Sequence, residues 1–152
     1  MKIYTSYFYN IRHFTPNIIP VSTCMSDPAW YKPPEGKEYY VDKNGVICGL
    51  RYEPLIVQRE GTHACHGPES CWYAISDIRD PYGNEARCPT MIEYEQLLYS
   101  LVDKEKTLKA FEYCCNKFKA NTICLIVYEA PTNPCSERWA LQKFFNCEEW
   151  RR

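Results

Sequence analysis

No stretch of this chain has a hydrophobic run that approaches the length of a membrane-spanning helix, which needs about 20 apolar residues. The N-terminal segment does not resemble a signal peptide, because its apolar run is short and interrupted by polar residues. An excess of one charge is also missing, since 18 Lys and Arg offset 19 Asp and Glu. We therefore expect a cytoplasmic protein, with neither a membrane nor a nucleic-acid polymer as partner, because both usually require a basic surface.

Cysteine and tyrosine, by contrast, are abundant. Ten cysteines would indicate a disulfide scaffold in a secreted chain, but without an export signal we expect reduced thiols, buried or bound to a metal. Aromatic residues make up 15% of the chain, with 13 Tyr. Tyrosines of this number line a pocket or an interface, or simply fill a Tyr-rich core, and the composition leaves both interpretations open.

The order of the expected elements indicates a single α/β domain over residues 1–152. Strands are predicted at residues 2–8, 17–24 and 122–128, and helices at 90–102, 104–119 and 136–147. The unbroken apolar run at 124–127 suits a central parallel strand that is covered on both faces. We expect a small Rossmann-like layered domain with a short, mainly parallel sheet. An irregular Cys- and His-containing insertion is expected at about 39–89, beginning with a hairpin whose turn, Asn44-Gly45, supplies positive φ angles.

The carboxyl ends of the three strands are the expected ligand site, as in other open α/β sheets. The predicted ligand-binding residues are Ser6, Tyr7, Asn10, Ser22, Trp30, Tyr31, Tyr128, Glu129, Cys135, Ser136 and Arg138. Aromatic rings stack on a base, a carboxylate accepts hydrogen bonds from a ribose, and a helix start with an arginine holds phosphate. This inventory favours a small nucleotide-like or nucleoside-derived ligand.

Three of these residues also have ordinary structural interpretations. Ser136 suits a helix N-cap, Arg138 suits an ion pair with Glu137 or Glu129, and Trp30 suits the core.

A second cluster of candidate residues lies in the middle of the chain. Cys65, Cys71 and Cys88, with His63 or His66 as the fourth ligand, form a set suited to tetrahedral structural zinc. Their spacing departs from the usual Cys-x-x-Cys pair, so unligated reduced cysteines are the competing interpretation. No organic cofactor is expected.

Three sequence blocks resemble a bacterial and phage family known as the domain of unknown function number four hundred and eighty-eight. The blocks are Tyr4-Thr5-Ser6-Tyr7-Phe8, then Val21-Ser22 followed by Pro28-Ala29-Trp30-Tyr31, then Tyr128-Glu129-x-Pro131-x-x-x-Cys135. The family motif continues as Cys-His-Arg, whereas this chain has Cys135-Ser136-Glu137-Arg138, without the His and with the Arg one position later. The resemblance implies the fold more than the function, because the family has no agreed activity.

Three functions remain open from the sequence. The first, favoured by the missing His, is binding without turnover, for example by a phage anti-defence sponge that sequesters a nucleotide immune signal in the host cytoplasm. The second is an enzyme that cleaves or transfers at a nucleoside glycosidic bond, with Glu129 as the key carboxylate or, less favoured, Cys135 as a nucleophile. The third is a protein-interaction module. A homo-oligomer is compatible with each of them.

Overall fold

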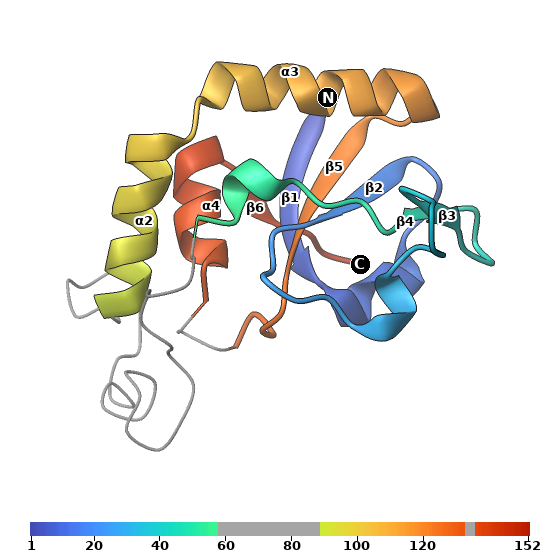
Figure 1. The fold of residues 1–152 in the computed structure, drawn as a ribbon, viewed down its shortest axis with the longest axis horizontal. Coiled ribbons are helices and arrows are strands. Elements are labelled where there is room, and N and C mark those ends of the chain that lie inside the picture. Colours follow the sequence, from blue (N-terminus) through green and yellow to red (C-terminus); the bar gives the residue numbers. More distant parts are fainter. Residues whose placement is uncertain (58–88, 133–135) are drawn as a thin grey trace.

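The computed structural model describes residues 1–57, 89–132 and 136–152 (Figure 1). Its main sheet has four parallel strands, in the order β2-β5-β1-β6. These strands are β1 (Lys2–Tyr7), β2 (Ile18–Ser22), β5 (Thr122–Val127) and β6 (Glu148–Glu149). The sheet and its helices confirm the predicted α/β layered class.

Strand β5 occupies the interior of the sheet and is buried along its whole length. Ile123, Leu125 and Val127 pack into one hydrophobic cluster, while Cys124 and Ile126 pack into another. Because successive side chains of a strand point to opposite faces, a strand covered on both sides needs apolar residues at every position. This explains why an unbroken apolar run predicted the strand correctly.

Three helices belong to the first cluster: α2 (Pro89–Leu101), α3 (Lys104–Phe118) and α4 (Arg138–Phe145). Figure 1 shows α2 beside α4, with α3 crossing the end of the sheet where β1 begins. Helix α3 begins after Asp103, whose carboxylate accepts a hydrogen bond from the backbone N–H of Lys106 at 3.0 Å. Phe111 and Cys115 form its buried face, as the helical spacing predicted.

The second cluster is covered by short elements rather than by long helices. These are the 3-10 turns η1 (Phe8–His13) and η2 (Ala29–Tyr31) and a hairpin of β3 (Tyr40–Val41) and β4 (Ile47–Cys48). A third 3-10 turn, η3 (Glu53–Leu55), places Leu55 in the first cluster. The hairpin at the start of the expected insertion therefore contributes to the core, with Val46 and Cys48 fully buried.

Local geometry departs from the sequence predictions at the hairpin turn and at η2. Of the two turn residues, only Gly45 has a positive φ, of 79°. The Asp42 carboxylate instead organises the turn by accepting the backbone N–H groups of Asn44 at 2.8 Å and Val46 at 3.0 Å. The sequence Ser26-Asp27-Pro28 is typical of a helix start, but only the single 3-10 turn η2 follows it, because Pro33 disfavours helical geometry at the residue before it.

The described residues contain no helix that is both long enough and apolar enough to cross a membrane. The remainder of the expected insertion, residues 58–88, lies outside the described part of the chain.

Candidate binding site

The carboxyl ends of the parallel strands meet at one edge of the sheet. Ser6 of β1 and Ser22 of β2 both lie opposite Ile126 of β5. A pocket of about 370 Å³ opens beyond this edge, between the segments that follow β2 and β5 and the residue before α4. We call it the acidic pocket, and it is lined by Cys24, Met25, Ser26, Asp27, Pro28, Tyr128, Glu129 and Glu137.

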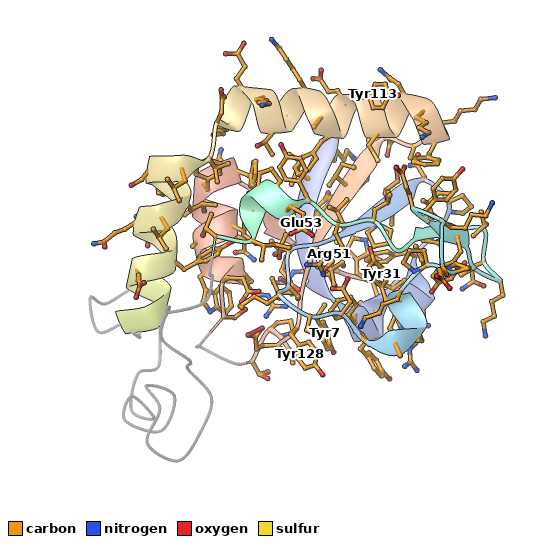
Figure 2. The ribbon with its side chains drawn as sticks, in the orientation of Figure 1. Tyr7, Tyr31, Arg51, Glu53, Tyr113 and Tyr128 are labelled. Atoms are coloured by element: carbon orange, nitrogen blue, oxygen red, sulfur yellow. The ribbon has the colours of Figure 1, made fainter. Side chains whose placement is uncertain are left out.

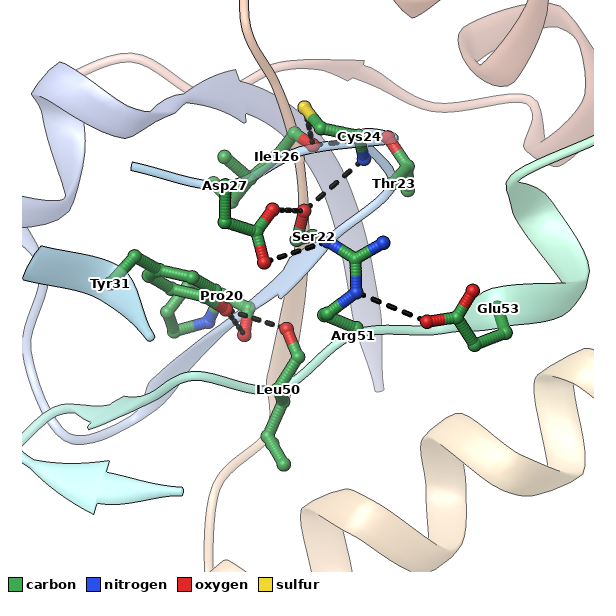
Figure 3. A network of polar contacts seen from close by, with 10 residues as sticks. All are labelled: Pro20, Ser22, Thr23, Cys24, Asp27, Tyr31, Leu50, Arg51, Glu53 and Ile126. Carbon is green, nitrogen blue, oxygen red and sulfur yellow. Dashed lines mark hydrogen bonds and ion pairs between the residues drawn. The ribbon is translucent and has the colours of Figure 1, made fainter. Parts of the chain in front are cut away.

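The segment after β2 is held in place by hydrogen bonds to the end of β5. The backbone N–H and the hydroxyl of Thr23 both donate to the carbonyl of Ile126 at 3.0 Å. The hydroxyl of Ser22 donates to Asp27 at 2.5 Å and accepts the backbone N–H of Cys24 at 3.1 Å (Figure 3). These contacts make this wall of the pocket a fixed part of the fold.

Asp27 is compensated by a neighbouring cation. Its buried carboxylate lies 2.7 Å from Nη1 of Arg51, and Nε of the same arginine lies 3.1 Å from Glu53 (Figure 3). Tyr31 lies behind this network and donates its hydroxyl to the carbonyl of Leu50 at 2.7 Å. Asp27 therefore adds little net negative charge to the pocket.

Glu137 is a buried carboxyl group of the pocket with a strongly shifted pKa. Burial, followed by the negative charge of Glu129, raises the pKa of Glu137 to about 8. Burial and the charges of Glu137, Glu129 and Asp27 likewise raise the pKa of the Cys24 thiol well above its ordinary value. These raised pKa values favour a protonated Glu137 carboxyl group and a neutral Cys24 thiol in the pocket at neutral pH.

Of the predicted ligand-binding residues, Tyr128 and Glu129 line the acidic pocket. Ser6 and Ser22 are fully buried, and Ser6 accepts a hydrogen bond from Asn10 at 3.0 Å. These serines support the edge of the sheet and do not face the pocket.

The aromatic residues Trp30 and Tyr31, predicted to contact the ligand, lie in two different environments. Tyr31 is completely buried in the second cluster, whereas Trp30 is half exposed and lines a different pocket. Tyr7 stacks on Tyr9, with ring centroids 6.0 Å apart. Because adjacent residues of a 3-10 turn point in different directions, Trp30 and Tyr31 do not form one surface.

Arg138 has no exposed surface, although it was predicted to hold phosphate at the mouth of the helix. Its Nε lies 2.8 Å from Oε1 of Glu149, and its Nη2 donates to Oε2 of that residue at 3.4 Å. The structural ion pair considered from the sequence is present, but its partner is Glu149 rather than Glu137 or Glu129. The N-cap residue of α4 is Glu137 rather than Ser136, so the capping role considered for Ser136 is wrong by one position. The Ser136 hydroxyl nevertheless accepts the backbone N–H of Arg138 at 3.2 Å.

Sequence reasoning missed the residues between Cys24 and Pro28, and it treated Glu137 only as an ion-pair partner. The sequence contained a signal for the residues from Cys24 to Pro28, because they directly follow a predicted strand, as Tyr128 does.

Several predicted residues lie outside the described part of the chain. They are Cys135 and the predicted zinc ligands His63, Cys65, His66, Cys71 and Cys88. No group of residues suited to hold a metal ion occurs in the described part of the chain.

Comparison of the chain with models of protein families, with curated proteins and with solved structures finds no match. The family resemblance of the three sequence blocks therefore stays a prediction. The function of the acidic pocket has to be inferred from its own geometry and chemistry.

We expect Arg138→Gln to destabilise the fold by about 3 kcal/mol, because it leaves the largely buried Glu149 carboxylate without its cation. Thr5 and Gln142 still contact that carboxylate, at 2.8 and 3.4 Å, which keeps the loss at the lower end of the usual range. Urea denaturation measures the loss. Lys109→Gln is the matched control, since its pair with Glu105 is exposed and should contribute less than about 1 kcal/mol. Equal effects of the two substitutions would contradict a structural role for Arg138.

The raised pKa of Glu137 predicts a pH-dependent stability. Between its ordinary value of 4.5 and about 8, the folded state keeps a proton that the unfolded chain releases, so the free energy of unfolding falls as pH rises. In Glu137→Gln this contribution is absent. Urea denaturation from pH 5 to 9 should show wild type losing stability relative to the variant, whereas Glu148→Gln, at an exposed position, should follow wild type. Parallel curves for wild type and Glu137→Gln would contradict the prediction.

Proposed function

We propose that this protein binds a small nucleoside-like molecule in the acidic pocket. The volume of about 370 Å³ is in the range of small-molecule sites. The observation that carries the proposal is that two carboxyl groups, Glu129 and Glu137, line one pocket. The raised pKa of Glu137 favours one hydrogen-bond donor and one acceptor from this pair at neutral pH. Sugar hydroxyls and base amides both donate and accept hydrogen bonds, so this pair complements them.

The remaining lining residues suit the same ligand. Tyr128 is 65% exposed, which leaves its ring accessible for stacking on a base. Met25 is exposed beside it and adds an adaptable apolar contact, and Ser26 supplies a hydroxyl group.

Charge argues against a phosphate in this pocket, and this changes the ligand expected from the sequence. No lysine, arginine or histidine is among the described residues that line it. Two arginines lie close to the pocket and both are paired, Arg51 with Asp27 and Glu53, and Arg138 with Glu149. A phosphate would face carboxylates without a compensating charge, so we assign the pocket to a neutral or cationic molecule such as a nucleoside.

Calorimetric titration with adenosine, guanosine, cytidine and uridine tests the proposal. We expect one of the four to bind, and Glu129→Gln or Tyr128→Ala to weaken its binding at least about tenfold, which corresponds to about 1.4 kcal/mol. Glu148→Gln and Tyr113→Ala are the matched controls. Glu148 lies on β6, and Figure 2 shows Tyr113 on α3, far from Tyr128. Thermal melting of each variant verifies its fold. Failure of all four nucleosides to bind at millimolar concentration would refute the proposal.

An enzyme that acts on the glycosidic bond is the second candidate, and the pKa of Glu137 favours it. A carboxyl group that keeps its proton next to one that has lost it is the arrangement used for general acid catalysis of such reactions. Glu137 would then protonate the leaving base as the glycosidic bond breaks, and Glu129 would stabilise the positive charge that develops on the sugar. A water molecule would add to the anomeric carbon, and the proton that it releases would restore Glu137.

Chromatography of the four nucleosides after incubation with the protein distinguishes the two candidates. If the protein is a binding protein, as we propose first, each nucleoside is recovered intact. Free base that appears with wild type and is lost in both Glu129→Gln and Glu137→Gln, while the nucleoside still binds, would instead establish the enzyme. Base release that persists in both variants would assign the reaction to other residues.

A further inference from the structure

A second and larger pocket lies beside the hairpin, at the end of η1 and η2. Its volume is about 560 Å³. We call it the hairpin pocket, and it is lined by Phe8, Tyr9, Ile11, Arg12, Trp30, Tyr40, Asp42, Lys43 and Asn44. None of these residues lines the acidic pocket, so the two pockets have separate walls.

Aromatic rings make up much of this pocket. Trp30 and Tyr9 are the most exposed of them. Each is 53% exposed. Trp30 is nevertheless fixed, because its ring packs edge-on against Phe8 and Tyr31, at 6.1 and 6.0 Å, and its carbonyl accepts the hydroxyl of Tyr40. A fixed, half-exposed indole ring is a surface on which a flat aromatic group stacks at little cost in conformational entropy.

Two cationic side chains, Arg12 and Lys43, also line the hairpin pocket. The guanidinium of Arg12 lies 3.8 Å above the ring of Tyr9, and its Nε donates to the carbonyl of Tyr9 at 3.1 Å. Across the described part of the chain, no carboxylate forms an ion pair with Arg12 or Lys43. The positive charges of Arg152 and Arg12 also contribute, after burial, to lowering the pKa of the neighbouring His13.

The one carboxylate of the hairpin pocket is directed elsewhere. Oδ1 of Asp42 accepts the backbone N–H groups of Asn44 and Val46, and its Oδ2 accepts the thiol of Cys48 at 3.8 Å. These hydrogen bonds hold the Asp42 carboxylate at the hairpin turn without cancelling its charge. Together with this one carboxylate, the two cations Arg12 and Lys43 leave the pocket with a net positive charge that attracts an anion.

We propose that the hairpin pocket is a binding site for an aromatic anion of the nucleoside monophosphate class. The base stacks on Trp30, and the phosphate lies between Arg12 and Lys43, which are suited to it as a planar guanidinium and a mobile ammonium group. This is the reverse of the acidic pocket, where no cation is available and a phosphate is disfavoured. The site does not depend on the function proposed for that pocket.

Titration with adenosine monophosphate, followed by the NMR signal of the Trp30 indole N–H, tests the proposal. That signal is assigned by its loss in Trp30→Phe. We expect saturable shifts with adenosine monophosphate, and at least about tenfold weaker responses with adenosine, which lacks the anion, and with ribose 5-phosphate, which lacks the ring. Arg12→Gln/Lys43→Gln should weaken binding at least tenfold, whereas Lys106→Gln/Lys109→Gln, which removes the same charge from the exposed face of α3, should leave it unchanged.

The two pockets are distinguished by crossed variants. Binding of adenosine monophosphate should persist in Glu129→Gln, where the Trp30 signal reports it. It should be lost in Trp30→Ala, where calorimetric titration replaces the missing signal and thermal melting verifies the fold, because the half-exposed ring also packs on Phe8 and Tyr31. The proposal is overturned if no shift of the Trp30 signal occurs, if ribose 5-phosphate or adenosine binds there as tightly as the nucleotide, or if the two double variants weaken binding equally.

Discussion

The burial of β5 on both faces is the constraint on which the rest of the structure depends. Each of its six residues is buried, and it pairs in parallel with β1 on one side and with β2 on the other. Two hydrophobic clusters follow, because a strand with apolar residues on both faces must be covered twice. Helices α2, α3 and α4 belong to the first cluster, and the short elements around the hairpin belong to the second. The acidic pocket lies between the segments that follow β2 and β5 and the residue before α4, and the hairpin pocket lies among the short elements of the second cluster.

The buried carboxyl end of β5 also determines the chemistry of the acidic pocket. The strand delivers Tyr128 and Glu129 to the edge of the sheet, and the same edge receives Asp27 after β2 and Glu137 before α4. Three carboxyl groups in one place repel one another, and the structure reduces this repulsion in two ways. Asp27 is neutralised by Arg51, and Glu137 keeps a proton. The raised pKa of Glu137 is therefore a consequence first of its burial and then of the neighbouring charge of Glu129.

The sequence allowed the sheet to be predicted well and the site only in part, for a physical reason. The β5 strand and helix α3 show their burial in regular patterns of apolar residues, which are local in sequence. Arg138 is buried in an ion pair with Glu149 instead of facing a ligand. Glu149 belongs to the two-residue strand β6, which is positioned by its pairing with β1, where Glu149 lies opposite Thr5. No periodicity reveals a strand of two residues. Likewise, Trp30 and Tyr31 are adjacent and similar in type, and only the direction imposed by the turn makes one exposed and the other buried.

The division of charge between the two pockets follows from the same architecture. The cations close to the acidic pocket form structural ion pairs. Arg51 binds Asp27 and so holds the segment after β2, and Arg138 binds Glu149 and so links α4 to β6. Arg12 and Lys43 form no ion pair among the described residues, and the one contact of the Arg12 side chain within the fold is local, to the carbonyl and ring of Tyr9. The η1 turn and the hairpin that carry them are held by apolar packing and by the hydrogen bonds of Asp42. Cations that the fold does not need for its own stability are the ones available to a ligand. For this reason we expect an anion to bind in the hairpin pocket, and a ligand held by hydrogen bonds to bind in the acidic pocket.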